Sequence, residues 1–129
     1  MPERERLAHP LVGGVILFTR NYRDHEQLKA LCDSILKLRS PRPLLAVDHE
    51  GGRVQRFRVG FSRVPAMRTL GSRFLEDAAV ALEDARAYGR TIGQELAAFG
   101  IDLCFAPVLD LDHGVSPIIG ERAFADRRD

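Results

Sequence analysis

Three short apolar runs along the chain predict buried β-strands, at residues 12–18, 44–47 and 101–105. The first two contain no charged residue, and the third contains one, Asp102. Runs of this length are too short to form helices of their own, and continuous apolarity is typical of parallel strands, which are buried on both faces. The chain is therefore expected to contain a parallel sheet.

Two longer stretches repeat apolar residues at spacings of three and four, which predicts helices with one buried face. The first begins at Asp24, whose carboxylate can accept from the amides of the first turn while Gln27 reaches back. Its apolar stripe runs to Leu38 and ends before a Ser-Pro pair. The second helix is predicted over residues 75–99, with Gly100 placed to end it.

Strands that alternate with helices in the order βαβαβ indicate an α/β fold, because such connections force the strands to run parallel with right-handed crossovers. An open doubly wound sheet and a (β/α)₈ barrel both fit this pattern, and periodicity does not separate them. A closed barrel usually needs about 250 residues, so a barrel would be only partly contained in these 129 residues. Residues 60–65, between the second strand and the second helix, are expected to form an ordered loop.

Composition narrows the functional classes. Nineteen basic and eighteen acidic residues leave a net charge of +1, so no overall field attracts nucleic acid or an anionic membrane. No apolar segment approaches the roughly 20 residues that span a bilayer, and no secretion signal is apparent at the N-terminus. We therefore expect a soluble protein of the cytoplasm. Cys32 and Cys104 lie in apolar helical and strand contexts and are expected to be buried free thiols.

Polar residues begin abruptly where the second predicted strand ends, with Asp48, His49 and Glu50 followed by two glycines. Ligands of α/β folds bind at the carboxyl ends of the strands, which makes Asp48 the first candidate for a functional residue. The three polar residues could be metal ligands, a general acid and base, or a polar loop that caps the strand. No two histidines have helical i, i+4 spacing and no Cys-x-x-Cys motif occurs, so neither a metal nor a cofactor is predicted.

Six arginines between residues 53 and 73 are interleaved with phenylalanines, a composition that also occurs on surfaces that bind single-stranded nucleic acid. Acidic residues lie within reach of several of these arginines, and a guanidinium group pairs well with carboxylates and sugar hydroxyls. Ion pairing is the favoured interpretation, and neither a nucleic-acid partner nor a membrane partner is predicted.

Four segments in order along the chain carry a more specific signal. They read AHPLVGGVILFTRN at residues 8–21, AVDHEGGRVQRF at residues 46–57, FAPVLD at residues 105–110 and IGER at residues 119–122. Together they strongly resemble the bacterial β-N-acetylhexosaminidases of glycoside hydrolase family 3, and the resemblance covers nearly the whole chain.

The resemblance implies that residues 1–129 are a fragment of a single family 3 N-terminal barrel domain, a partial TIM (β/α)₈ barrel of parallel strands alternating with helices. It implies removal of terminal β-linked N-acetylglucosamine from muropeptides during cytoplasmic peptidoglycan recycling. The anomeric configuration would be retained, because the reaction passes through a covalent glycosyl-enzyme intermediate. Asp48, Arg56 and Arg122 would bind the N-acetylglucosamine unit, the carboxylate accepting from sugar hydroxyls and the arginines donating to them. His49 stands where the family commonly has glutamine, a change that is expected to be tolerated.

The resemblance also implies that the family's first strand, its Lys-His-Phe-Pro-Gly-His segment, its acid/base loop and its nucleophilic aspartate lie outside residues 1–129. We therefore expect substrate-binding residues without catalytic ones in this chain. An isolated three-stranded piece leaves sheet edges unpaired, so the remainder of the barrel or self-association is expected to be needed. The alternatives are a non-catalytic module that binds muropeptides or sugars and, more distantly, a nucleic-acid-binding domain built on the arginine-rich segment.

Overall fold

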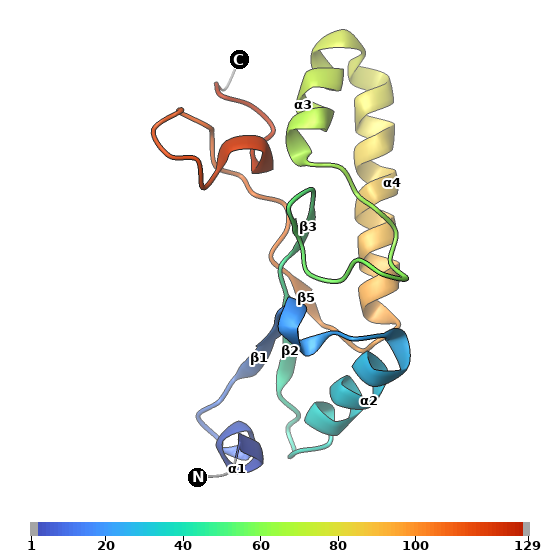
Figure 1. Cartoon of the computed structure of the whole chain (residues 1–129), viewed down its shortest axis with the longest axis vertical. Coiled ribbons are helices and arrows are strands. Elements are labelled where there is room, and N and C mark those ends of the chain that lie inside the picture. The colour runs from blue at the N-terminus through green and yellow to red at the C-terminus, as the bar shows by residue number, and fades with distance from the viewer. Residues whose placement is uncertain (1–2, 128–129) are drawn as a thin grey trace.

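A three-stranded parallel sheet lies at the centre of the computed structural model, which describes residues 3–127. Its order is β1 (Gly14–Leu17), β2 (Leu44–Val47) and β5 (Leu103–Cys104), and β2 pairs in parallel with both neighbours. These strands lie within the three predicted apolar runs, so the predicted parallel α/β core is confirmed. Because the strands run the same way, their carboxyl ends meet at one edge of the sheet (Figure 1).

The remaining regular elements are four helices, one antiparallel hairpin and two short 3₁₀ turns among the described residues. In chain order they are α1 (Glu3–Ala8), η1 (Thr19–Asn21), α2 (His25–Leu36), the hairpin strands β3 (His49–Gly51) and β4 (Val54–Gln55), α3 (Met67–Glu76), α4 (Ala78–Ala97) and η2 (Gly120–Arg122).

The start of α2 follows the prediction. Asp24 has an extended backbone, and its Oδ1 accepts from the backbone amide of Gln27 at 2.7 Å. The Gln27 side chain reaches back as expected, although its Oε1 accepts from the amide of Arg23, at 2.8 Å, one residue before the cap. Two of the amides at this helix start therefore have partners.

The long helix predicted over residues 75–99 is confirmed as α4, which has slightly narrower bounds, whereas α3, directly before it, was not predicted. The structure contains two helices, α3 and α4, packed against each other as a helical hairpin (Figure 1). The break falls at Asp77, whose backbone is extended and whose Oδ1 accepts from the amides of Ala79 and Val80 at 3.0 and 3.1 Å. Because aspartate satisfies these amides only outside the helix, it starts α4 instead of continuing α3.

The β3–β4 hairpin was not predicted, because its two strands are very short and lack an apolar run. Its turn contains Gly51 and Gly52, both with positive φ, a region that favours glycine. A Cβ at Gly51 would lie 2.5 Å from the carbonyl oxygen of Pro65, so the predicted ordered loop at residues 60–65 runs directly against the hairpin. The amide of Gly52 donates to the carbonyl of Val64 at 2.9 Å, which fixes this contact.

The two faces of the sheet differ. Alternate strand residues point to opposite faces, and one set packs against α2 and α4, which lie on the same side of the sheet (Figure 1). The buried residues of this core include Leu17, Leu28, Cys32, Ile35, Leu45, Val47 and Leu96. A doubly wound sheet would carry helices on both faces, so this one-sided packing agrees with the predicted partial barrel.

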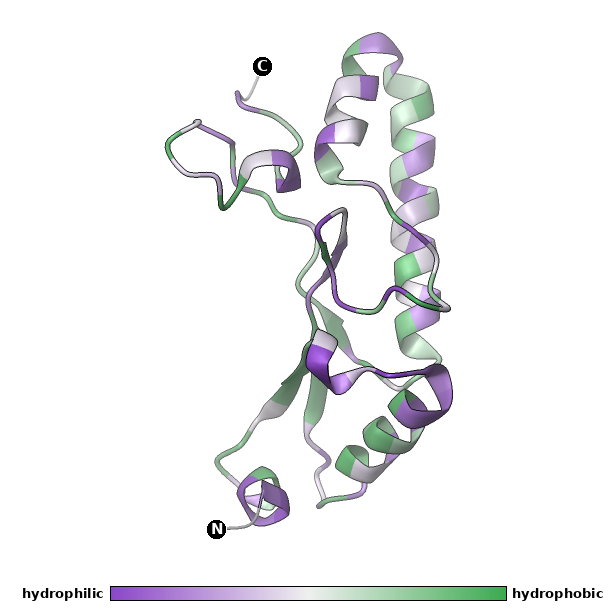
Figure 2. Cartoon of the chain, viewed as in Figure 1, coloured by the Kyte–Doolittle hydropathy of each residue, from purple (hydrophilic) through white to green (hydrophobic). Residues whose placement is uncertain are grey.

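On the opposite face the sheet is uncovered by the described residues. Ile16, Leu44 and Leu103 are 48%, 56% and 48% exposed, one from each strand. The strands are strongly hydrophobic along their length (Figure 2). The register places Ile16 and Leu103 on either side of Ala46, with Leu44 further along β2, so this face is an exposed apolar surface of the kind that marks an interaction site.

Both cysteines are free thiols, as predicted. Cys32 is buried in the core, and Cys104 on β5 is half-buried. Within residues 3–127, no helix is both long and apolar enough to cross a membrane.

A matched pair of glycine substitutions tests the packing of the C-terminal segment. A Cβ at Gly71 in α3 would overlap the carbonyl oxygen of Phe124, whereas a Cβ at Gly89 in α4 meets nothing within 4 Å. Gly71→Ala should lower the free energy of unfolding by about 1–3 kcal/mol, because the segment must move away. Gly89→Ala should raise it by about 1 kcal/mol, because alanine is the better helix former. Urea unfolding of the two variants measures both; equal stability of Gly71→Ala and the unchanged chain would contradict the close approach.

Candidate functional site

The candidate site lies at the edge where the carboxyl ends of β1 and β2 meet, and strand geometry decides which side chains reach it. The backbone continues from β2 almost directly into β3, so side chains two residues apart point to the same side. Asp48 and Glu50 both pair with arginines at this edge. His49 points the other way, into the core, where it packs on Phe57 and Phe61 with ring centroids 5.7 and 5.6 Å apart.

Asp48 and Arg56, two of the predicted site residues, are brought together. Nη2 of Arg56 donates to Oδ2 of Asp48 at 3.2 Å, and both side chains remain partly exposed. The guanidinium carbon of Arg56 also lies 5.4 Å from the centre of the Phe18 ring, next to the end of β1. The buried Nε of Arg56 has no hydrogen-bond partner among the described residues. Arg56 is thus held by a carboxylate and an aromatic ring while it keeps unused donors.

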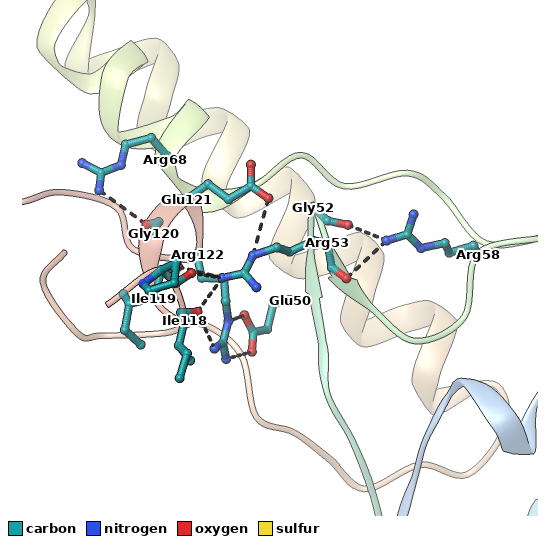
Figure 3. Close-up of polar contacts among 11 residues, drawn as sticks. Glu50, Gly52, Arg53, Arg58, Arg68, Ile118, Ile119, Gly120, Glu121 and Arg122 are labelled. Atoms are coloured by element: carbon teal, nitrogen blue, oxygen red, sulfur yellow. Dashed lines mark hydrogen bonds and ion pairs between the residues drawn. The ribbon is translucent and has the colours of Figure 1, made fainter. Parts of the chain in front are cut away.

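Arg122, the third predicted residue, pairs with Glu50. Its Nε donates to Oε2 at 2.8 Å and its Nη2 donates to Oε1 at 2.6 Å, which makes a two-bond fork (Figure 3). The hydrogen bonds to Glu50 raise the pKa of Arg122, and the negative charges of Asp48 and Asp110 add to this shift. The charge of Asp48 therefore also acts on Arg122, although the direct partner of Arg122 is Glu50.

The loop that carries Arg122 is fastened by other arginines, to the hairpin through Arg53 and to α3 through Arg68. Nη2 of Arg53 donates to the carbonyls of Pro117 and Ile118, at 2.9 and 2.5 Å (Figure 3). Nη2 of Arg68 donates to Oδ2 of Asp112 at 2.9 Å. These contacts agree with the interpretation of the arginine-rich segment as ion-pairing residues that hold loops in place.

His49 is a buried neutral imidazole. Its side chain is 1% exposed, and neither ring nitrogen has a hydrogen-bond partner among the described residues. Burial lowers the pKa of His49 to about 4, an effect that the negative charge of Glu95 partly opposes. Because His49 points away from Asp48 and Glu50, the three side chains do not form a common set of metal ligands. No group of three or more His, Cys, Asp or Glu side chains within residues 3–127 is arranged to hold a metal ion.

The sequence predicts the edge of the sheet at which the site lies, but it does not predict that Glu50 is the partner of Arg122 there. Glu50 was one of three polar residues with open roles, and no sequence pattern connects it to Arg122, 72 residues further on. The i, i+2 spacing of Asp48 and Glu50 on an extended backbone was the available signal. Phe18, which stacks on Arg56, gave no signal of its own because it ends an apolar run.

Comparisons with known proteins identify the family of the chain. The sequence matches the glycosyl hydrolase family 3 N-terminal domain over residues 1–129. It is 61% identical to a beta-hexosaminidase of Aromatoleum aromaticum over 123 residues, which are 95% of this chain and 35% of that protein. It is also similar to the crystal structure of native NagZ from Neisseria gonorrhoeae, with a TM-score of 0.93 and 52% identity over 96% of this chain and 37% of that one.

A second structure of NagZ from Neisseria gonorrhoeae was determined in complex with N-trifluoroacetyl-D-glucosamine. This chain matches it with a TM-score of 0.92 and 52% identity, over 96% of this chain and 36% of that one. The chain thus spans about a third of the length of the relatives that it matches.

Acid should weaken the structure through His49. Its pKa is about 4 in the folded chain and about 6.5 when unfolded, so the unfolded chain binds more protons between these values. The contribution of the neutral imidazole to the free energy of unfolding is complete above pH 6.5. It is lost as the pH falls towards 4, and the loss is about 3 kcal/mol at most. His49→Gln does not titrate and should flatten this pH dependence in urea unfolding measured from pH 7.5 to 4.

The exposed His113 provides the matched control. His113→Gln should keep the slope of the unchanged chain, because that side chain lies at the surface. Identical slopes for the unchanged chain and His49→Gln would show that the buried imidazole does not govern acid stability.

Proposed function

This chain belongs to glycosyl hydrolase family 3, and we propose on that basis that it forms the substrate-binding edge of a β-N-acetylhexosaminidase. The observation that carries the proposal is the pairing of Asp48 with Arg56 beside the pairing of Glu50 with Arg122. Carboxylate acceptors and guanidinium donors at one edge match the hydroxyl and acetamido groups of a sugar. The relatives named above supply the reaction class.

The three residues take separate roles in this proposal. Asp48 accepts from sugar hydroxyls through the carboxylate lone pairs that Arg56 leaves free. Arg56 donates from its unused N–H groups, and Arg122 donates from those that Glu50 does not occupy. The complex of the related NagZ with N-trifluoroacetyl-D-glucosamine supports a ligand of the N-acetylglucosamine type.

The proposed reaction is removal of terminal β-linked N-acetylglucosamine from muropeptides in cytoplasmic peptidoglycan recycling. Retention of configuration would proceed through a glycosyl-enzyme intermediate and needs a nucleophile and an acid/base, which the resemblance assigns to an aspartate and to an Asp/His loop. Asp48 and Glu50 are each engaged by an arginine, so we assign them to binding and support. We propose that the acid/base and the nucleophile come from a region corresponding to the other two thirds of the relatives.

The uncovered face of the sheet also supports a division of the site between this chain, which supplies binding residues, and the remainder of the barrel, which supplies catalytic ones. Ile16, Leu44 and Leu103 expose aliphatic surface on the side opposite to α2 and α4. In a closed barrel this face packs against side chains from the other strands. We propose that the remainder of the barrel covers it, and that the chain alone associates with itself through this face.

Hydrolysis of p-nitrophenyl β-N-acetylglucosaminide tests the reaction. The full-length product of the gene that encodes these residues should release p-nitrophenol, and Asp48→Ala should lower kcat/KM about 10- to 100-fold, the value of a lost hydrogen bond to a charged group. Asp33→Ala removes an exposed carboxylate on α2 and serves as the control.

Three outcomes are informative. A folded but inactive gene product would contradict the proposed reaction. A folded 129-residue chain that binds N-acetylglucosamine without turnover would fit the division of roles. Turnover by the 129-residue chain above its Asp48→Ala variant would place catalytic groups within residues 1–129 and refute that division.

Analytical ultracentrifugation and thermal melts test the uncovered face. The 129-residue chain should self-associate and melt with low cooperativity, whereas a chain extended to the length of its relatives should be monodisperse. Replacing Ile16 and Leu103 with serine should reduce the association of the short chain. Equal cooperativity and monodispersity of the two lengths would contradict this assignment.

A further inference from the structure

Glu50 is a buried carboxylate at the edge of the site. Its side chain is 3% exposed, and Arg122 is its ion-pair partner. A buried charge costs several kcal/mol unless it is paired and hydrogen-bonded. Both oxygens of Glu50 accept from Arg122, one each from Nε and Nη2. The carboxylate is therefore too enclosed, and too fully occupied, to contact a sugar itself.

The fork fixes the plane of the Arg122 guanidinium. Two parallel hydrogen bonds to one carboxylate prevent rotation about the last bonds of the side chain. Nη1 of Arg122 donates to the carbonyl of Ile118 at 3.3 Å. Three of the five N–H groups of the guanidinium are thus engaged within the described residues, and one N–H on each terminal nitrogen is left for a ligand.

The backbone of the same loop is held separately. Arg53 donates to the carbonyls of Pro117 and Ile118, and its Nε lies 3.8 Å from Oε1 of Glu121 (Figure 3). These contacts place the main chain around η2, but none of them orients the Arg122 side chain. Glu50, from the neighbouring hairpin, does so with two short hydrogen bonds, to which the carbonyl of Ile118 adds a longer one.

We propose that Glu50 is the positioning residue for Arg122: its carboxylate turns the guanidinium so that the two remaining N–H groups face the sugar. This inference rests on the proposed function, because it assumes that Arg122 binds the substrate. Glu50 acts through Arg122 and does not touch the substrate or the reacting atoms. Glu50 therefore strengthens the binding of the substrate and of the transition state equally, which affects KM and leaves kcat unchanged.

Glu50→Gln in the full-length gene product tests this role. Glutamine keeps the shape, but its amide nitrogen opposes an N–H of Arg122, so one bond of the fork is lost. We expect KM for p-nitrophenyl β-N-acetylglucosaminide to rise about 10-fold while kcat changes by less than about 3-fold. Glu83→Gln makes the same chemical change on an exposed side chain of α4, away from the site, and should leave both constants unchanged.

A double-mutant cycle separates positioning from a general structural role. If Glu50 acts through Arg122, Glu50→Gln combined with Arg122→Ala should be no worse than Arg122→Ala alone. Additive losses would overturn the inference. If Glu50→Gln does not fold, Glu50→Asp keeps the charge but shortens the side chain, and it should raise KM in the same direction.

A spectroscopic readout distinguishes failure of this inference from failure of the proposed function. The Nε–H group of Arg122 should give a ¹⁵N NMR signal protected from solvent exchange, and Glu50→Gln should abolish that protection. A folded protein that neither binds nor hydrolyses the glucosaminide would refute the proposed function and, with it, the role of Glu50 in binding. An active protein in which Glu50→Gln keeps the original KM would refute the positioning role alone.

Discussion

The extended backbone that continues from β2 into β3 is the constraint on which the site depends. Along this stretch Val47 and His49 face the core, whereas Asp48 and Glu50 face the edge where their arginines lie. A shift of one residue would turn both carboxylates into the apolar core, away from their arginines, and expose the core residues. The energetic cost of burying two unpaired charges therefore fixes the register, and the register in turn fixes the direction of each polar side chain.

Packing beneath the edge reinforces this arrangement. His49 fills a space between Phe57 and Phe61 and contributes apolar contact without a hydrogen bond to the described residues. The Gly51–Gly52 turn then brings β4 back, and the close contact with residues 64 and 65 prevents the turn from opening. The rigidity of the edge thus comes from the layer behind it, which carries no charge of its own at neutral pH.

The sequence was sufficient for features that depend on neighbouring residues. The strands of the parallel sheet, the cap at Asp24 and the position of Asp48 after β2 all follow from local patterns of apolar and polar residues. It was insufficient for α3, whose few buried residues leave no clear stripe, and for the start of α4 at Asp77. The pairing of Glu50 with Arg122 depends on how two distant segments fold together, which no local periodicity records.

The contacts of Arg53 have an evolutionary consequence. Its guanidinium holds the loop before η2 through the main-chain carbonyls of residues 117–119, which every amino acid possesses. The side chains of Val115 and Ile118 project largely into solvent. The side chains of this loop are thus free to change in sequence without displacing Arg122 from the edge of the sheet.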